Sequence, residues 1–388
     1  MTSPLEKRIR RHVIGKSQRF FAVTAPGLEP LCLGELESLG LTGAAVAGGV
    51  EFSGRLQAAY LANLGLRTAN RILMRVHEFR ATSFRALAQE ASSLPWELFI
   101  APGTSLRIHV TTHHCRLHHS DAIAERVRNA ITERLPEYCD ADARMPQQIF
   151  IRGVDDRFTA SLDSSGENLY RRGIKTHAGE APLRETLAAA VLMLAGYSGE
   201  EVLLDPMCGA GTFSLEAALM AKHLPPGGHR DFAFMAWPGF RPAHWNFLKR
   251  NADAQVIRLS TPRIMASDTN PLACQALEEC VGRHGLADAV CVTCRDFFDI
   301  DPRDLTDRPG LIALNPPYGR RLGTRAQHTL LLRNVFQVLR EKYRGWKAVL
   351  IVPHTGGQSD IPFPAHVQHF FHGGLTVNVV VGEIPSNG

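Results

Sequence analysis

The feature that most constrains the fold is an alternation of short apolar strands and helices in the second half of the chain. From residue 183 onward, segments such as EVLLD (201–205) and GLIALN (310–315) alternate with stretches of helical periodicity. Short apolar strands joined by helices are typical of a doubly wound parallel sheet, because helices cover both of its faces. We therefore expect residues 166–388 to form a Rossmann-like α/β domain with a mostly parallel sheet.

The first 165 residues follow a different pattern. Strands and helices mix there without strict alternation, which favours an α+β arrangement. Residues 224–262, rich in Pro, Gly and aromatic residues, interrupt the later alternation and are interpreted as an insertion. The expected elements of the first part include strands at 20–24, 48–54, 72–79, 105–112, 148–153 and 157–163, and an amphipathic helix at 121–135.

Length and charge set broad limits. A chain of 388 residues exceeds one ordinary core, so two or three domains are expected. The net charge of +5 is a mild excess, but residues 1–18 form a basic tail, and Arg171, Arg172 and Lys175 cluster near mid-chain. Both groups could be solvated or could contact phosphates. Without a long apolar run or a secretion signal, we expect a cytoplasmic protein with no membrane partner.

The loop after the first strand of this alternation contains two glycines. In such sheets, ligands bind beyond the carboxyl ends of the strands. Asp205 and Pro206 follow EVLL directly, and Gly209 and Gly211 come next. The glycines would let the backbone approach a ligand at the start of a helix, while Asp205 would accept from a cationic or amine-bearing group. A tight turn without a ligand is the alternative interpretation.

Acidic residues also follow the next two strands. Asp268 stands where a nucleotide-binding sheet grips a ribose diol, and Asp296 with Phe297 offers an acceptor and a ring for an adenine. An ordinary turn with a buried Phe could explain the latter pair alone. No lysine follows the glycines as a phosphate loop requires, so a triphosphate is disfavoured. S-adenosylmethionine, a nucleoside without a phosphate chain, fits these features.

A rigid elbow, Asn315-Pro316-Pro317-Tyr318, ends the fourth strand. Asn315 and the carbonyl of Pro316 can both accept hydrogen bonds from an exocyclic amine of a nucleobase. Holding that amine localises its lone pair and aims it at a methyl donor. The prolines would fix the carbonyl direction, and Tyr318 would give the base a face to stack on. We expect these four residues to form the catalytic target-base site.

These motifs resemble those of class I S-adenosylmethionine-dependent amino-methyltransferases. Residues 168–192, the HRDFAF segment and the opening FFAVTAPGLEPLCLGELESLG are in turn similar to the THUMP-containing RNA guanine-N2 methyltransferases, above all to the guanine-N2 half of the bacterial large-subunit rRNA enzyme. The motifs are DPMCGAGTF (205–213), SDTNP (267–271), RDFFD (295–299) and NPPYG (315–319).

The resemblance implies a division of the chain and a substrate. It implies a ferredoxin-like start at 19–54, a THUMP RNA-binding domain at 55–165 and a methyltransferase domain at 166–388. The expected reaction is methylation of guanine N2 in 23S rRNA or a large-subunit precursor. A tRNA guanine-N2 enzyme, a DNA adenine-N6 methyltransferase and a non-catalytic ribosome-assembly factor that binds RNA are the alternatives.

A histidine-rich segment, THHCRLHHSD (112–121), could suggest zinc. An apolar-poor loop of this kind before an amphipathic helix is more often solvated or faces RNA. We therefore predict no metal site.

Overall fold

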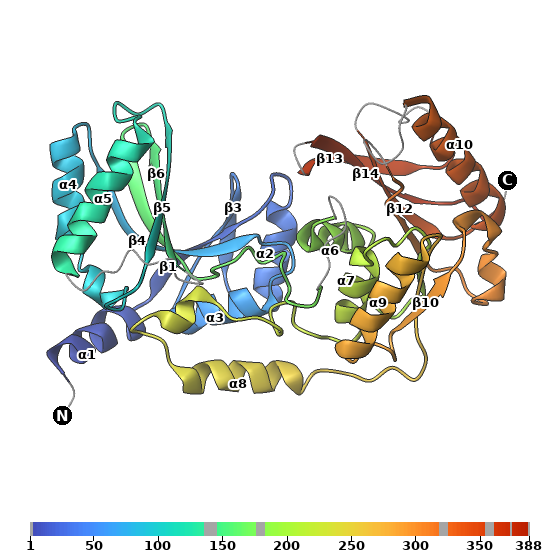
Figure 1. Ribbon diagram of the computed structural model, residues 1–388, viewed down its shortest axis with the longest axis horizontal. Coiled ribbons are helices and arrows are strands. Elements are labelled where there is room, and N and C mark those ends of the chain that lie inside the picture. Colours follow the sequence, from blue (N-terminus) through green and yellow to red (C-terminus); the bar gives the residue numbers. More distant parts are fainter. Residues whose placement is uncertain are drawn as a thin grey trace. The chain divides into compact units, whose positions relative to one another are not determined.

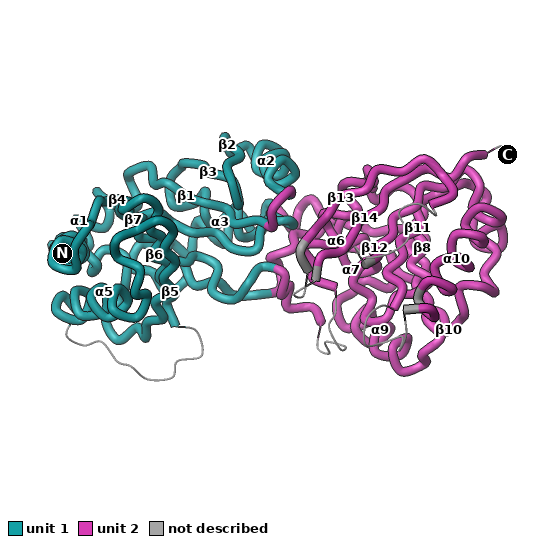
Figure 2. Tube along the Cα trace, turned by 90° about the horizontal axis from the view of Figure 1, so that it is seen from above, with its two compact units in different colours: residues 1–24, 28–169, 230–251 teal, residues 25–27, 170–229, 252–388 magenta. Residues whose placement is uncertain are grey.

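The computed structural model describes residues 3–135, 146–175, 183–317, 325–353, 361–372 and 375–386. The chain divides into two compact units (Figure 2). The N-terminal unit contains residues 1–24, 28–169 and 230–251, and the C-terminal unit contains 25–27, 170–229 and 252–388. Residues 230–251, part of the predicted insertion, thus belong with the N-terminal unit. The predicted domain limits stay predictions.

One seven-stranded sheet forms the N-terminal unit, with the strand order β2-β3-β1-β4-β7-β6-β5. Its described strand pairs are antiparallel except for β5 with β6, which are parallel. The strands are β1 (Gln18–Val23), β2 (Gly43–Val46), β3 (Gly49–Gly54), β4 (Arg71–Arg80), β5 (Leu106–His113), β6 (Gln147–Val154) and β7 (Arg157–Asp163). All six strands expected here are confirmed, and β2 was not expected.

Helices cover one face of this sheet (Figure 1). Its strands alternate, so that one face carries buried apolar side chains such as Ile72, Met74, Ile149 and Ile151. The helices of the unit are α2 (Glu29–Ser38), α3 (Leu56–Gly65), α4 (Phe84–Ser93), α5 (Ser120–Arg134) and α8 (Pro242–Asp253), with 3₁₀ helices η2 (Trp96–Leu98) and η3 (Ala233–Ala236). The opposite face carries mostly polar side chains.

The start of the chain differs from the predicted tail. Residues 4–14 form α1 (Pro4–Ile9) and a π-helical turn, η1 (Arg10–Ile14). Ser3 and Glu6 form a capping box at the first turn, and Ile9 and Val13 are buried. The apolar positions among the basic residues therefore attach this segment to the core of the unit.

A second seven-stranded sheet forms the C-terminal unit, with the order β10-β9-β8-β11-β12-β14-β13. The five strands β8 to β12 are parallel, and β14 and β13 are antiparallel, so the mostly parallel α/β fold is confirmed. The strands are β8 (Leu203–Asp205), β9 (Ile264–Asp268), β10 (Val290–Cys294), β11 (Leu311–Leu314), β12 (Lys347–Pro353), β13 (Ala365–His372) and β14 (Leu375–Glu383).

The order of this sheet reverses beside β8. From β8 the chain proceeds through β9 to β10 on one side, and then crosses to β11 and β12 on the other. Such a switch point leaves a crevice outside the carboxyl ends of the strands. The helices of the unit are α6 (Glu185–Leu194), α7 (Thr212–Ala221), α9 (Pro271–Arg283) and α10 (Arg325–Lys342), with 3₁₀ helices η4 (Phe297–Asp299) and η5 (Pro302–Asp304). In the described part of the chain, no helix is long and apolar enough to cross a membrane.

Candidate active site

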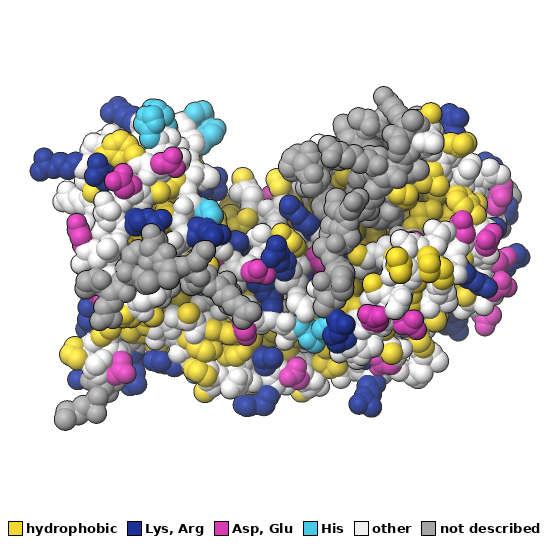
Figure 3. Space-filling model, in the orientation of Figure 1, with side chains coloured by type: hydrophobic (Ala, Val, Ile, Leu, Met, Phe, Trp, Pro, Cys, Tyr) yellow, Lys and Arg dark blue, Asp and Glu magenta, His cyan; other side chains and the backbone are white. Residues whose placement is uncertain are grey.

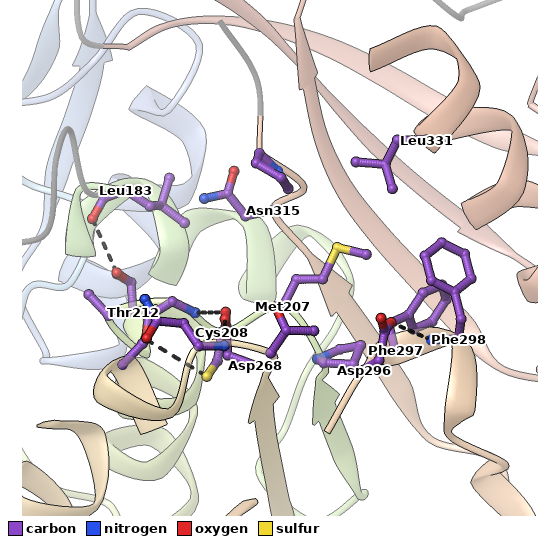
Figure 4. Close-up of a pocket in the computed structure, with 17 residues that line it drawn as sticks. Leu183, Met207, Cys208, Thr212, Asp268, Asp296, Phe297, Phe298, Asn315 and Leu331 are labelled. Carbon is purple, nitrogen blue, oxygen red and sulfur yellow. Dashed lines mark hydrogen bonds between the residues drawn. The ribbon is translucent and has the colours of Figure 1, made fainter. Parts of the chain in front are cut away.

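A cavity of about 710 Å³ lies beyond the carboxyl ends of β8, β9, β10 and β11 (Figure 4). Its walls come from the loops that follow these four strands and from the first turns of α7 and α9, together with one residue before α6 and one from α10. The lining residues are Leu183, Pro206, Met207, Cys208, Gly209, Ala210, Thr212, Asp268, Thr269, Asn270, Ala273, Asp296, Phe297, Phe298, Asn315, Pro317 and Leu331. Seven of the eleven predicted site residues line this one cavity.

The loop after β8 makes a left-handed turn into α7. Gly209 and Gly211 have φ values of +50° and +69°, a region that favours glycine. A Cβ atom on Gly211 would lie 2.3 Å from Cδ1 of Leu277 on α9. Gly209 lines the cavity, whereas Gly211 does not, so packing between α7 and α9 accounts for Gly211.

Asp205, at the end of β8, is 1% exposed and does not line the cavity. Its Oδ2 accepts hydrogen bonds from the backbone N–H of Ser214 at 3.1 Å and from the Ser214 hydroxyl at 2.6 Å. Its Oδ1 is buried without a hydrogen-bond partner among the described residues. Burial, with the nearby charge of Asp268, raises the pKa of Asp205 to about 7, against the lowering effect of Ser214. Its predicted contact with a cationic or amine-bearing group of the ligand stays a prediction.

Asp268 ties two strand ends together and lines the cavity. Its Oδ2 accepts from the backbone N–H of Gly209 at 2.8 Å, and its Oδ1 accepts from that of Asn270 at 2.9 Å. Asn270 in turn caps α9 by accepting from the backbone N–H of Leu272. The carboxylate is therefore held in place by backbone donors, and its remaining lone pairs can accept from a ribose hydroxyl.

Asp296 and Phe297 follow β10 and are positioned by different forces. Asp296 caps η4, because its Oδ1 accepts from the backbone N–H of Phe298 at 3.0 Å. Phe297 is 1% exposed, with its ring 6.0 Å from the ring of Tyr343. The core therefore fixes the Phe297 ring, and both residues still reach the cavity wall.

Asn315 follows β11, and its Oδ1 is buried without a hydrogen-bond partner among the described residues. In Figure 4 its amide lies across the site from Asp268 and Asp296, with Met207 between them. Pro317 lines the cavity, whereas Pro316 is buried and does not. Tyr318 lies outside the described residues. A buried amide oxygen without a partner destabilises the fold by about 1–3 kcal/mol, because it has lost its hydrogen bonds to water. A hydrogen-bond donor on a ligand at this position would offset that desolvation cost.

Some lining residues were not predicted from the sequence. Met207 stands inside the predicted loop but was given no role, and Leu183 and Leu331 reach the cavity from segments far from the strand ends. Leu183 lies before α6, and Leu331 lies on α10. Apolar residues on helices carry no chemical signal in the sequence, because most of them pack in a core.

Two of the three cations in the basic cluster near mid-chain form ion pairs within the protein, whereas Arg171 is exposed. Arg172 is buried and pairs with Glu216 at 2.9 Å, and Lys175 pairs with Glu185 at 3.0 Å. Lys175 also donates to the hydroxyl of Thr212, which lines the cavity. The interpretation as solvated cations is therefore wrong for Arg172 and Lys175, because they hold the segment before α6 against α7. A contact of this cluster with phosphate stays a prediction.

The histidines of residues 112–121 are exposed, and Figure 3 shows cyan side chains at one end of the N-terminal unit. Among the described residues, no three His, Cys, Asp or Glu side chains are grouped to hold a metal ion.

Two protein-family models match two different segments of the chain. The RMKL-like methyltransferase domain (UPF0020) matches residues 172–356, and the RlmL ferredoxin-like domain matches residues 19–73. Neither model is a THUMP model, so the THUMP assignment stays a prediction.

Curated relatives agree with these models. A ribosomal RNA large subunit methyltransferase K/L from Methylococcus capsulatus is 35% identical over 86% of this chain and 46% of its own. A putative RNA methyltransferase from Synechocystis is 30% identical over 94% of this chain and 96% of its own. The chain spans about half the length of the K/L relatives that it matches.

Solved structures share the whole architecture. A putative methyltransferase complexed with SAH, SMU.472, has a TM-score of 0.84 at 26% identity, covering 96% of this chain and 99% of that one. A predicted N6-adenine-specific DNA methylase from Listeria monocytogenes has a TM-score of 0.85 at 25% identity, covering 96% and 97%.

The sheet order, the cavity at its switch point and these likenesses define a class I S-adenosylmethionine-dependent methyltransferase. Within this class, the chain belongs to the RMKL-like methyltransferases.

Proposed function

We propose that this chain transfers the methyl group of S-adenosylmethionine to an exocyclic base amine of RNA, with guanine N2 of 23S rRNA, or of a large-subunit precursor, as the target. The observation that carries this proposal is the buried Oδ1 of Asn315 at the cavity wall, which has no hydrogen-bond partner among the described residues. An amide oxygen accepts hydrogen bonds, so the group that completes this site is a donor such as a base amine.

Asn315 orients the amine of the target base. A nucleobase amine is a poor nucleophile, because its lone pair is delocalised into the ring. Accepting one of its hydrogens favours the pyramidal nitrogen and directs the lone pair into the cavity. The strand β11 and the prolines after it restrict the backbone on both sides of Asn315, so little reorganisation is needed.

The opposite side of the cavity fits the nucleoside part of the cofactor. Asp268 would accept from the ribose, Asp296 would accept from the adenine amine, and Gly209 leaves room for close approach. When bound, S-adenosylmethionine supplies an electrophilic methyl group. Phe297, fixed by the core, would lie beside the adenine.

The lining residues offer no strong general base. The two acids of the cavity lining, Asp268 and Asp296, already accept hydrogen bonds from backbone N–H groups. The described lining contains no histidine. This fits amine methylation, in which the proton becomes acidic after the methyl has transferred. Positioning, rather than proton abstraction, is therefore the contribution of this chain.

The names of the relatives support RNA as the substrate. Several are ribosomal RNA methyltransferases, and these bacterial enzymes act on an RNA made in the cytoplasm, where we place this protein. The Listeria structure carries a DNA adenine-N6 title, which keeps that reaction as the second candidate.

Methylation in vitro separates the candidates. The purified chain is incubated with S-adenosylmethionine and 23S rRNA, tRNA or DNA, and the nucleosides are analysed by mass spectrometry. We expect N2-methylguanosine from 23S rRNA and no product from DNA. N6-methyladenine in DNA would overturn the proposal in favour of a DNA adenine-N6 methyltransferase. N2-methylguanosine in tRNA alone would show that the substrate is tRNA rather than 23S rRNA. Cofactor binding without any product would favour an assembly factor.

A further inference from the structure

The polar face of the N-terminal sheet carries a patch of arginines. Arg80 on β4, Arg152 on β6 and Arg157 on β7 line one depression of about 980 Å³, and are called here the arginine face. Strand register places them on one side of the sheet, because Arg157 stands opposite Arg80 and Arg152 stands opposite Thr159. Helices α4 and α5 cover the other side (Figure 1).

Two acids beside the arginine face, Glu78 and Glu51, are already engaged in ion pairs. Glu78, which also lines the depression, pairs with Arg19 at 2.9 Å, and Glu51 pairs with Arg75 at 2.5 Å. Asp155, the other lining acid, lies 3.8 Å from His114. Among the described residues, no carboxylate lies within ion-pair distance of Arg80, Arg152 or Arg157.

The pairing of Arg80 with Arg157 works against folding. Like charges directly opposite one another in an antiparallel pair are destabilising. The two side chains are exposed, and an Arg in either place could be replaced by an uncharged residue without loss of a described ion pair. Two neighbouring guanidinium groups without a counterion form a site for an anion with more than one charge.

Aromatic rings occupy the same side of the sheet. Phe150 on β6 stacks on His109 of β5, with ring centroids 4.7 Å apart and planes 17° apart. Phe150 precedes Arg152 by two residues, so both side chains project from one face. Arginines beside aromatic rings on an open sheet are the combination that binds single-stranded nucleic acid, through its phosphates and its bases.

We propose that the arginine face binds the sugar–phosphate backbone of a single-stranded segment of the RNA substrate, with a neighbouring base against the His109 ring, because Arg71 already lies over the Phe150 ring at 5.3 Å. This inference rests on the proposed RNA substrate and assigns its contact surface. Phosphates would replace the missing carboxylates between Arg80 and Arg157. Binding would then stabilise a region that is strained by its own charge.

The test compares two charge-matched double variants of the full chain. Arg80→Gln with Arg157→Gln changes the arginine face, whereas Arg85→Gln with Arg126→Gln changes exposed residues of α4 and α5. Binding of fluorescein-labelled oligouridylate is measured by anisotropy over a range of salt concentrations. SAH binding and methyl transfer to 23S rRNA are measured on the same samples.

We expect the dissociation constant of the first variant to rise about tenfold, and its salt slope to fall by about 1.4, or about 0.7 for each lost phosphate contact. SAH binding should not change, and the melting temperature should not fall. The control variant should bind like the wild type, and the double lysine variant of the arginine face should keep the salt slope. Equal losses in both glutamine variants, or no loss in the first, would overturn the inference.

The two proposals can fail separately. If the wild type methylates RNA while the arginine-face variant binds like the control, the arginine face does not bind RNA. The proposed function is then unaffected. If the wild type binds oligouridylate through the arginine face but transfers no methyl group to any RNA, the proposed function is wrong. The RNA-binding role of the arginine face is then upheld.

Discussion

The carboxyl edge of the C-terminal sheet and the arginine face of the N-terminal sheet both contain polar groups without partners among the described residues. The group at the edge is buried and neutral, whereas the groups on the arginine face are exposed and charged. At the edge, Asn315 keeps a buried oxygen without a partner among the described residues, in a cavity whose two acids are fixed by backbone hydrogen bonds. On the arginine face, exposed guanidinium groups lack a carboxylate in the described part of the chain. The first arrangement orients one small group, and the second attracts an extended anion.

The two regions should therefore respond to different perturbations. A buried hydrogen-bonding site depends on individual atoms, and one substitution removes its effect. An exposed charged site depends on the number of charges and on salt, and single substitutions remove only a part of it. The predictions below use this contrast, beginning with the largest expected effect.

Replacing Asn315 by Ala should lower kcat by at least about 100-fold, because it removes the acceptor for the target amine. SAH affinity should stay nearly unchanged, since the nucleoside residues are on the other side of the cavity. Rates are measured under saturating cofactor, with SAH binding measured by calorimetry. An Asn315→Ala enzyme with the normal rate would refute the role of the amide.

Replacing Asp268 by Ala should weaken SAH binding by about tenfold or more, through loss of the ribose acceptor and of the backbone contacts to Gly209 and Asn270. Asp307→Ala, at an exposed position of the same unit, is the matched control and should bind normally. Calorimetry checks both variants. Equal SAH affinity in the Asp268→Ala and Asp307→Ala variants would mean that Asp268 does not bind the ribose.

The pH dependence of stability should distinguish Asp205 from an ordinary acid. Its pKa is raised by burial from 3.8 to about 7, so the protonated form favours the folded state. The wild type should lose this contribution as the pH rises from about 4 through 7, on the order of 4 kcal/mol in all. Melting temperatures of Asp205→Asn relative to the wild type should therefore increase across this range. A constant difference would mean that the acid does not titrate there.

Salt should affect the two regions unequally. The SAH dissociation constant should change less than about twofold between about 50 and 200 mM salt, because the cavity binds through short hydrogen bonds. RNA binding should weaken steeply over the same range. Parallel salt titrations check the difference, and a steep dependence of SAH binding would remove the contrast between the regions.

The sequence predicts the C-terminal unit well where periodicity and strand ends carry the information. The apolar strands, the turns after them and the acids at their ends are local features, and seven of the predicted site residues meet in one cavity. Strands β13 and β14 were missed. They form an antiparallel hairpin at the sheet edge, outside the alternation on which the expectation rested.

Other features could not be predicted because they depend on long-range packing. Arg172 looks like a surface cation in the sequence, and its buried partner Glu216 lies on α7, 44 positions away. Residues 230–251 follow α7 of the C-terminal unit in the chain but belong with the N-terminal unit. Leu331 reaches the cavity through the placement of α10. No short motif encodes such contacts.

A crystal structure of the chain with SAH tests the central claim most directly. We predict that the nucleoside lies across the ends of β8, β9 and β10, with its ribose hydroxyls on Asp268, and that the sulfur faces the Asn315 amide. A ligand bound elsewhere, or an Asn315 side chain turned out of the cavity that holds SAH, would contradict the account.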